Sequence, residues 1–111
     1  MNIYFKNRRL EKIFNSEELI IKEYGQITAE EIMARMAVLD AAPSLKEVSH
    51  LKPERRHKLS GKMKDMFAVD LDKGNRLIFE PEEDAILDPD DVVTDLSNFT
   101  SITINSVEDY H

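Results

Sequence analysis

Hydrophobic residues in the first quarter of the chain recur at helical spacing. Leu10, Ile13 and Phe14 fall three or four positions apart, which is typical of a short helix with one buried face. A second helical segment follows Ser16, whose hydroxyl can cap a helix start. We expect that segment to stop at Gly25, because glycine is common just after the end of a helix.

The next stretch predicts a longer helix. Thr28 and Glu31 have the spacing of a capping box, and Pro43 cannot continue a helix. The expected buried face holds Ile32, Met36 and Leu39. A short joint before Thr28 suggests that the two main helices fold back as a helical hairpin. Ser44 and Glu47 repeat the capping pattern and predict one further helical turn.

The hydrophobic period then changes from helical to alternating. Strands are expected at residues 2–5, 66–71, 76–80 and 100–106. The sequence KGN between the second and third of these is a tight-turn signal. Together the patterns predict an α+β fold, with an N-terminal helical hairpin packed on a small, twisted, mostly antiparallel sheet. A chain of 111 residues is expected to be a single domain, residues 1–111.

Composition favours a globular protein with one modest core. Hydrophobic residues make up 41% of the chain and charged residues 33%. The absence of cysteine excludes disulfides and thiolate metal sites. The first residues contain no long apolar run, so neither a secretion signal nor a membrane span is expected. We therefore expect a cytoplasmic protein.

The net charge of -7 conceals an uneven distribution. Residues 80–95 contain eight acidic side chains and no basic ones, whereas residues 52–64 carry a net charge of +5. Two solvated surfaces of opposite sign are the simplest interpretation. The alternative is a basic groove that faces phosphate groups, with the acidic run on a loop between two strands.

The sequence contains no convincing metal or cofactor motif. Segments 70–75 and 88–98 begin like calcium loops but lack the required glycine and the terminal glutamate. The three histidines are too scattered for a recognisable zinc site. We expect no metal and no cofactor.

Several remaining side chains suit metal-free cleavage of RNA. That reaction requires a base for the 2′-hydroxyl proton, cations for the charged phosphorane and an acid for the departing oxygen. Groups that can move protons are His57, Asp109, Tyr110 and His111. Candidate cations are Arg76, Lys58, Lys62 and Lys64. Tyr110 can also stack on a base.

The chain resembles the RelE/ParE superfamily of bacterial toxins, on the HigB-like (plasmid maintenance or killer protein) branch. The similarity runs in order through NRRLEKIF, YGQITAEEIMARMAVLDAAPSL, RHKLSG, FAVDL, NRLIFEP and the terminal VEDYH. It implies two helices on a small antiparallel sheet and a metal-independent endoribonuclease that cleaves mRNA on the translating ribosome. It also implies a HigA-like helix-turn-helix antitoxin as partner. Operator DNA would be bound only through the antitoxin complex, and no membrane is involved.

The resemblance also assigns expected roles to single residues. His57 and Gly61 match a family H-x-L-x-G segment, and Arg76 matches the arginine expected at the scissile phosphate. The terminal DYH motif matches Asp109, Tyr110 and His111. His57 and His111 would share proton transfer, Tyr110 would stack on the nucleotide, and Asp109 would orient a histidine or take a proton. The expected RNA-binding residues are Lys52, Arg55, Arg56, Lys58, Lys62 and Lys64.

One departure from the family pattern keeps other functions open. Ser60 stands where the family often has a lysine, so a cation that would stabilise the transition state is missing. Lys58 or Lys62 could replace it, provided that a turn at Gly61 brings one of them towards His57. One alternative is a toxin that blocks a protein target without catalysis, as gyrase-poisoning relatives do. The other is a degenerate toxin that only binds its antitoxin.

Overall fold

A computed structural model of the chain describes residues 1–82 and 95–109, which form an α+β fold. In this part of the chain the helices are α1 (Arg8–Phe14), α2 (Glu17–Tyr24) and α3 (Gln26–Ala41). The strands are β1 (Asn2–Phe5), β2 (His57–Lys58), β3 (Phe67–Asp70), β4 (Asn75–Pro81) and β5 (Ser101–Asp109). Three short 3-10 turns are η1 (Leu45–Glu47), η2 (Gly61–Met63) and η3 (Leu96–Asn98).

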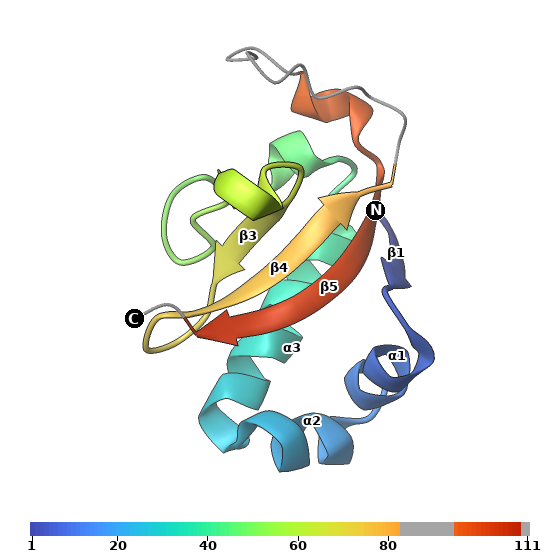
Figure 1. Cartoon of the computed structure of the whole chain (residues 1–111), viewed down its shortest axis with the longest axis vertical. Coiled ribbons are helices and arrows are strands. Elements are labelled where there is room, and N and C mark those ends of the chain that lie inside the picture. Colours follow the sequence, from blue (N-terminus) through green and yellow to red (C-terminus); the bar gives the residue numbers. More distant parts are fainter. Residues whose placement is uncertain (83–94, 110–111) are drawn as a thin grey trace.

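The strands form one mixed sheet in the order β1-β5-β4-β3-β2. β1 runs parallel to β5, and the other three pairs are antiparallel. Helix α3 crosses one face of the twisted sheet, and α1 and α2 lie at one end of it (Figure 1). The predicted α+β class, with N-terminal helices followed by a mostly antiparallel sheet, is confirmed. Within residues 1–82 and 95–109, no helix combines the length and the apolar character needed to span a bilayer.

Local capping explains where the helices begin and end. The Ser16 side chain accepts a hydrogen bond from the Leu19 N–H at 3.2 Å, as predicted, and α2 ends at Gly25. The prediction that the next helix begins at Thr28 is wrong, because α3 already starts at Gln26. Gly25 at φ +86° and ψ 163° turns the chain within one residue, so no longer joint is needed.

The segment after α3 contributes a single helical turn, as expected. Ala42 follows the last residue of α3, and η1 begins two residues after Pro43. The Ser44 hydroxyl bonds to the Glu47 carboxylate rather than to a backbone N–H, so the capping box forms only between side chains.

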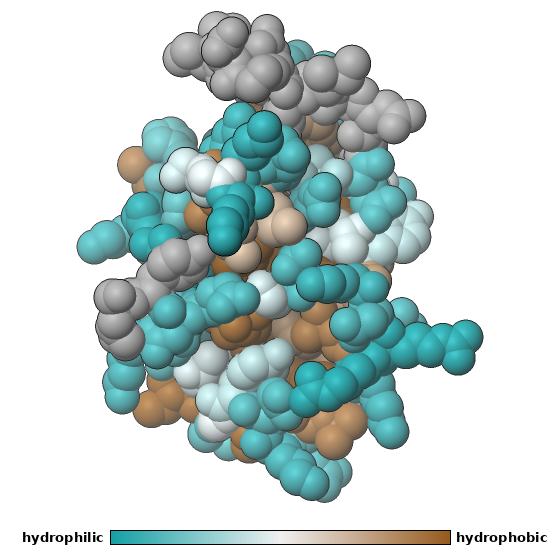
Figure 2. Space-filling model, viewed as in Figure 1, coloured by the Kyte–Doolittle hydropathy of each residue, from teal (hydrophilic) through white to brown (hydrophobic). Residues whose placement is uncertain are grey.

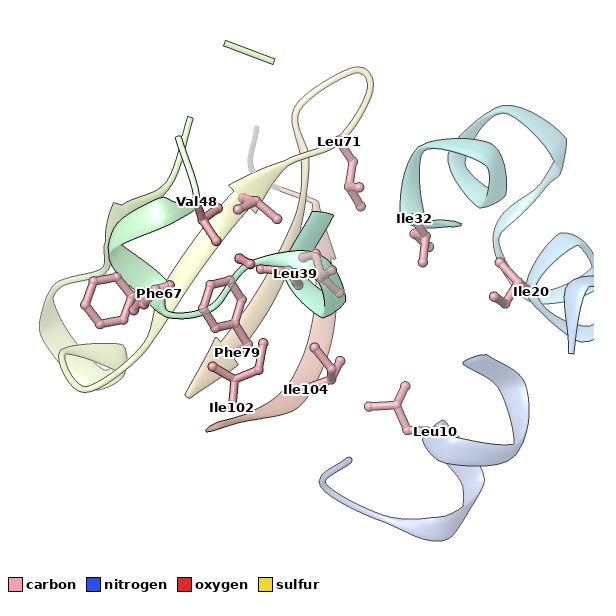
Figure 3. Packing of buried hydrophobic residues seen from close by; sticks show 14 of the residues in the cluster. Leu10, Ile20, Ile32, Leu39, Val48, Phe67, Leu71, Phe79, Ile102 and Ile104 are labelled. Carbon is pink, nitrogen blue, oxygen red and sulfur yellow. The ribbon is translucent and has the colours of Figure 1, made fainter. Parts of the chain in front are cut away.

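The core lies between the sheet and the helices. Leu39 of α3 packs among Phe79, Ile102 and Ile104 of the sheet, while Ile32, Ile20 and Leu10 extend the core towards α2 and α1 (Figure 3). Ile32 and Leu39 are fully buried and Met36 is half-buried, which confirms the predicted face of α3.

Phe99 adds a fully buried ring just before β5 and stands edge-on to Phe67, with ring centroids 6.5 Å apart. The predicted excursion between β4 and β5 therefore returns to the core at this residue. The excursion's residues 83–94 lie outside the described part of the chain.

Candidate active site

The sheet face that points away from the helices, called here the open face, collects several predicted site residues. The strand register aligns one row across β2, β3, β4 and β5, namely His57, Ala68, Ile78 and Ser106. Two positions further along, Asp70 and Arg76 are paired on the same face. Figure 2 shows this face, where hydrophilic side chains surround a narrow apolar strip over the strands.

The turn between β3 and β4 sets this pairing. Lys73 and Gly74 take positive φ values of 50° and 82°, and the Leu71 N–H donates to the Asn75 carbonyl at 2.8 Å. The tight turn places Asp70 and Arg76, which are equally far from its centre, opposite each other. Segment 70–75, considered above as a calcium loop, is therefore the end of β3, a β-turn over residues 72–75 and the start of β4.

Strand β5 brings its C-terminal end to the same place. Arg76 pairs with Glu108, and Asn75 pairs with Asp109, so β5 ends beside the β3–β4 turn (Figure 1). Glu108 is thus the β5 residue that shares the open face with Arg76, whereas strand alternation puts Asp109 on the opposite face of the sheet, so the expected grouping of Asp109 with Arg76 is not seen in the register. Tyr110 and His111 lie outside the described residues.

Asp70 is the electrostatic centre of the open face. Its carboxylate accepts two hydrogen bonds from Arg55, at 2.5 Å from Nε and 2.9 Å from Nη2. The Nε atom of Arg76 lies 3.8 Å from Oδ1 of the same carboxylate. Burial raises the pKa of Asp70. The Arg55 hydrogen bonds and the charges of Arg55, His57 and Arg76 lower it by more, so the net pKa is below the ordinary value. Asp70 is therefore ionised at neutral pH.

When its ring is neutral, His57 is held in one tautomer by the backbone. Its Nδ1 atom lies 2.7 Å from the carbonyl oxygen of Arg55. Because a carbonyl only accepts, Nδ1 must carry the proton, and Nε2 of the neutral ring keeps a lone pair. Within the described part of the chain, Nε2 is enclosed and has no hydrogen-bond partner. A neutral histidine in this state has the form required of a general base.

The loop that carries Arg55 and His57 is bonded to β3 and within itself. The Asp70 N–H donates to the Glu54 carbonyl at 2.8 Å, and the Arg55 N–H donates to the Leu51 carbonyl at 2.9 Å. On the helix side, Nε of the buried Arg35 donates to the Asp70 carbonyl at 2.8 Å. Asp70 thus connects α3, β3 and the loop before β2.

The predicted RNA-binding residues divide into two groups. Arg55 is bonded to Asp70, and Arg56 Nε donates to the Val48 carbonyl at 2.8 Å. Burial lowers the pKa of the Arg56 guanidinium. The four lysines of the segment are exposed, namely Lys52, Lys58, Lys62 and Lys64. The lysines are therefore better placed than the arginines to meet a phosphate backbone.

The chain turns at Gly61, which is the first condition of the hypothesis about Ser60, and the approach of a lysine to His57 stays a prediction. β2 contains two residues, and the chain turns at Gly61, with φ +66°, into η2. Because β2 contains both His57 and Lys58, these two side chains still point to opposite faces, and only Lys62 lies beyond the strand. The exposed Ser60 lies directly before this turn.

Sequence reasoning missed the role of Asp70 in the site. The alternating pattern placed Asp70 on the polar face of its strand, and the KGN turn contained the signal that pairs it with Arg76. Ser106 was also missed, although it lies in the His57 row and its Oγ is buried without a partner in residues 1–82 and 95–109. No signal in the sequence pointed to Arg35, whose helical position predicts only a partly buried side chain.

The open face combines three elements of the expected chemistry. It has a histidine in a defined tautomer, an arginine at ion-pair distance from a carboxylate, and the end of the strand that leads to Tyr110. Such a set can accept a proton from a hydroxyl group and stabilise an anion next to it. A scan against protein-family models and a search of curated proteins found no match to the chain.

Proposed function

We propose that this protein is the toxin of a type II toxin–antitoxin system and cleaves mRNA on the ribosome without a metal ion. The observation that carries the proposal is the position of His57 and Arg76 on the same sheet face, with the C-terminal end of β5 beside Arg76. Three separate segments of the sequence supply these groups, and each was expected at the site from the family pattern. Motifs that matched the family by chance would have no reason to lie on the same face of the sheet.

The roles combine the geometry of His57 and Arg76 with what the resemblance implies for the last three residues. His57 Nε2 would take the 2′-hydroxyl proton, and because this atom is enclosed in the free protein, binding of the RNA has to expose it. Arg76 supplies positive charge and hydrogen-bond donors for the scissile phosphate. His111 would return a proton to the leaving 5′-oxygen, and Tyr110 would stack on a base, as the resemblance implies. Asp109 would orient one of these groups.

The partners follow from the same proposal. The toxin acts in the bacterial cytoplasm, where ribosomes and mRNA are its targets. A HigA-like helix-turn-helix antitoxin neutralises it, and the complex of the two binds operator DNA. The exposed lysines on segment 52–64 face the RNA backbone.

Induced expression in bacteria tests the proposal. We expect growth arrest and, by primer extension, new mRNA ends that depend on translation. Removal of Tyr110 and His111 should abolish both effects while binding of the antitoxin is retained. Normal growth and uncut mRNA with the intact chain would refute the nuclease.

A second function is favoured by one observation. The ion pair between Asp70 and Arg76 partly neutralises the cation that the phosphate needs, and Ser60 does not replace it. These features fit a toxin-fold protein that acts only by binding another protein. In that case removal of Tyr110 and His111 leaves toxicity or antitoxin binding unchanged, whereas Ser60→Lys confers cleavage on an inert chain if the protein is a degenerate nuclease.

A further inference from the structure

We propose that Asp70 and Arg55 are positioning residues that fix the tautomer and orientation of His57. The catalytic consequence rests on the proposed nuclease function, whereas the state of the ring can be measured without it. Neither residue is expected to touch the reacting atoms. Both act through the backbone carbonyl that bonds to His57.

The first step is the backbone of Arg55. This residue has φ +45°, in the left-handed region that residues with a Cβ rarely adopt. Such a conformation persists only where surrounding contacts outweigh its cost. The contacts available here are the Arg55 N–H bond to Leu51 and the two bonds from the guanidinium to Asp70.

The second step is the effect on His57. The left-handed turn at Arg55 directs its carbonyl at Nδ1 of the histidine two residues later, at 2.7 Å. That bond determines which ring nitrogen carries the proton. Relaxation of Arg55 to an ordinary backbone conformation would move the carbonyl away, and the ring would then exchange between tautomers.

The third step is the position of Asp70 itself. Its backbone is held by the Glu54 carbonyl and by Arg35, so the carboxylate is presented from a rigid strand. Two-point binding of a guanidinium fixes its orientation as well as its distance. The pair therefore transmits the position of β3 to the loop that carries His57.

Two substitutions at Arg55 separate the backbone effect from simple loss of charge. Arg55→Ala and Arg55→Gly both remove the guanidinium, but glycine adopts positive φ without strain. We expect Arg55→Gly to retain the Nδ1–H tautomer of His57 and Arg55→Ala to lose it. Asp70→Ala should lose this tautomer as Arg55→Ala does, and the double variant Asp70→Ala/Arg55→Gly should regain it. Asp70→Asn serves where Asp70→Ala does not fold.

The measurement is a long-range ¹H–¹⁵N correlation spectrum of the full-length, ¹⁵N-labelled protein near pH 8. The His57 signals are assigned by their loss in His57→Gln. In the wild type, Nδ1 should show the shift of a protonated ring nitrogen and Nε2 that of an unprotonated one. Arg55→Ala should shift both values towards an average of the two tautomers.

The outcomes separate this inference from the proposed function. The inference would be overturned if Arg55→Ala kept the wild-type tautomer signals. It would also be overturned if Arg55→Gly lost the tautomer as completely as Arg55→Ala. If the protein cleaves RNA, Arg55→Ala should lower kcat about tenfold or more relative to Arg55→Gly, with similar KM values in the two variants. A wild-type protein that shows the expected tautomer but cuts no RNA refutes the nuclease and leaves the positioning role intact.

Discussion

At the scale of single residues, one carboxylate organises the cations of the open face. Asp70 binds Arg55 through two hydrogen bonds and holds Arg76 at the longer distance of 3.8 Å. The Arg55 guanidinium is therefore committed to the protein. Arg76 lies too far from Asp70 for a hydrogen bond and interacts with it through charge.

Substitution of Arg76 is the most direct residue-scale test of the nuclease. Arg76→Ala should lower the cleavage rate on ribosomes by about 10²-fold or more, since one donor to the transition state is lost. Arg76→Lys should cleave at a rate between those of the wild type and Arg76→Ala, because lysine keeps the charge but not the planar guanidinium. Lys22→Ala, an exposed cation on α2, is the control. Cleavage at the wild-type rate by Arg76→Ala would remove Arg76 from the site.

Asp70 should also make stability depend on pH. Its pKa in the folded protein is lower than in the unfolded chain, so its contribution is complete above about pH 4 and disappears as pH falls through the folded value. Asp70→Asn should lower the free energy of unfolding by about 1–2 kcal/mol at pH 7. Urea unfolding at pH 7 and pH 3 should show this difference shrink at the lower pH.

A control and a contrary result can be stated for this prediction. Asp65→Asn alters an exposed carboxylate in the loop before β3 and should produce no such pH-dependent difference. If Asp70→Asn lowers the free energy of unfolding by the same amount at pH 7 and pH 3, the ionised carboxylate does not stabilise the fold.

At the scale of elements, local signals predicted the helices and strands well and their exact ends less well. Ser16 and Gly25 marked the limits of α2 because capping is decided by neighbouring atoms. The start of α3 was missed because Gly25 ends one helix and begins the next, which no single-helix pattern describes. The parallel pairing of β1 with β5 depends on tertiary packing and had no local signal.

The candidate site was predictable in its components but not in its connections. His57 and Arg76 were expected from the motif pattern, and the structure brings them to one face through the strand register. The Asp70–Arg55 pair joins residues 15 positions apart across a loop with no regular pattern. Contacts of this kind follow from loop geometry, which hydrophobic periodicity does not encode.

Gly25 provides a test at the level of the joint between α2 and α3. Its φ and ψ values fall in a region that is nearly exclusive to glycine, yet a Cβ there would meet no atom within 4 Å beyond the adjoining backbone. Gly25→Ala should therefore destabilise the protein by about 1–3 kcal/mol through backbone strain alone. Gly25→Asn should be no better, because asparagine favours the left-handed helical region rather than this one. Urea unfolding of both variants checks the prediction, and a loss below about 0.5 kcal/mol would contradict it.

At the scale of the whole molecule, the distribution of charge matters more than its sum. The net charge of -7 would repel RNA, yet segment 52–64 is basic and its lysines are exposed. Salt screens charges more than about 10 Å apart, so a bound RNA strand responds mainly to the nearest side chains.

Two double variants with the same change of net charge test this view. Lys62→Ala/Lys64→Ala should weaken binding of a short 2′-O-methyl RNA by roughly tenfold and reduce the slope of log affinity against log salt by about 1.4. Lys12→Ala/Lys22→Ala, on the helices, should change neither quantity. Fluorescence anisotropy at several salt concentrations gives both values. Equal losses in the two variants would mean that net charge alone governs binding.

The pairing of β1 with β5 has a consequence for how the protein is made. Residues 2 and 101 are neighbours in the sheet although 99 positions separate them, and β5 inserts between two strands that are synthesised earlier. Contacts between residues so far apart in the sequence slow folding. The open face therefore cannot assemble on a nascent chain that has not yet passed residue 109. A toxin proposed to attack translating ribosomes would thus become active only after the ribosome that made it has finished that strand.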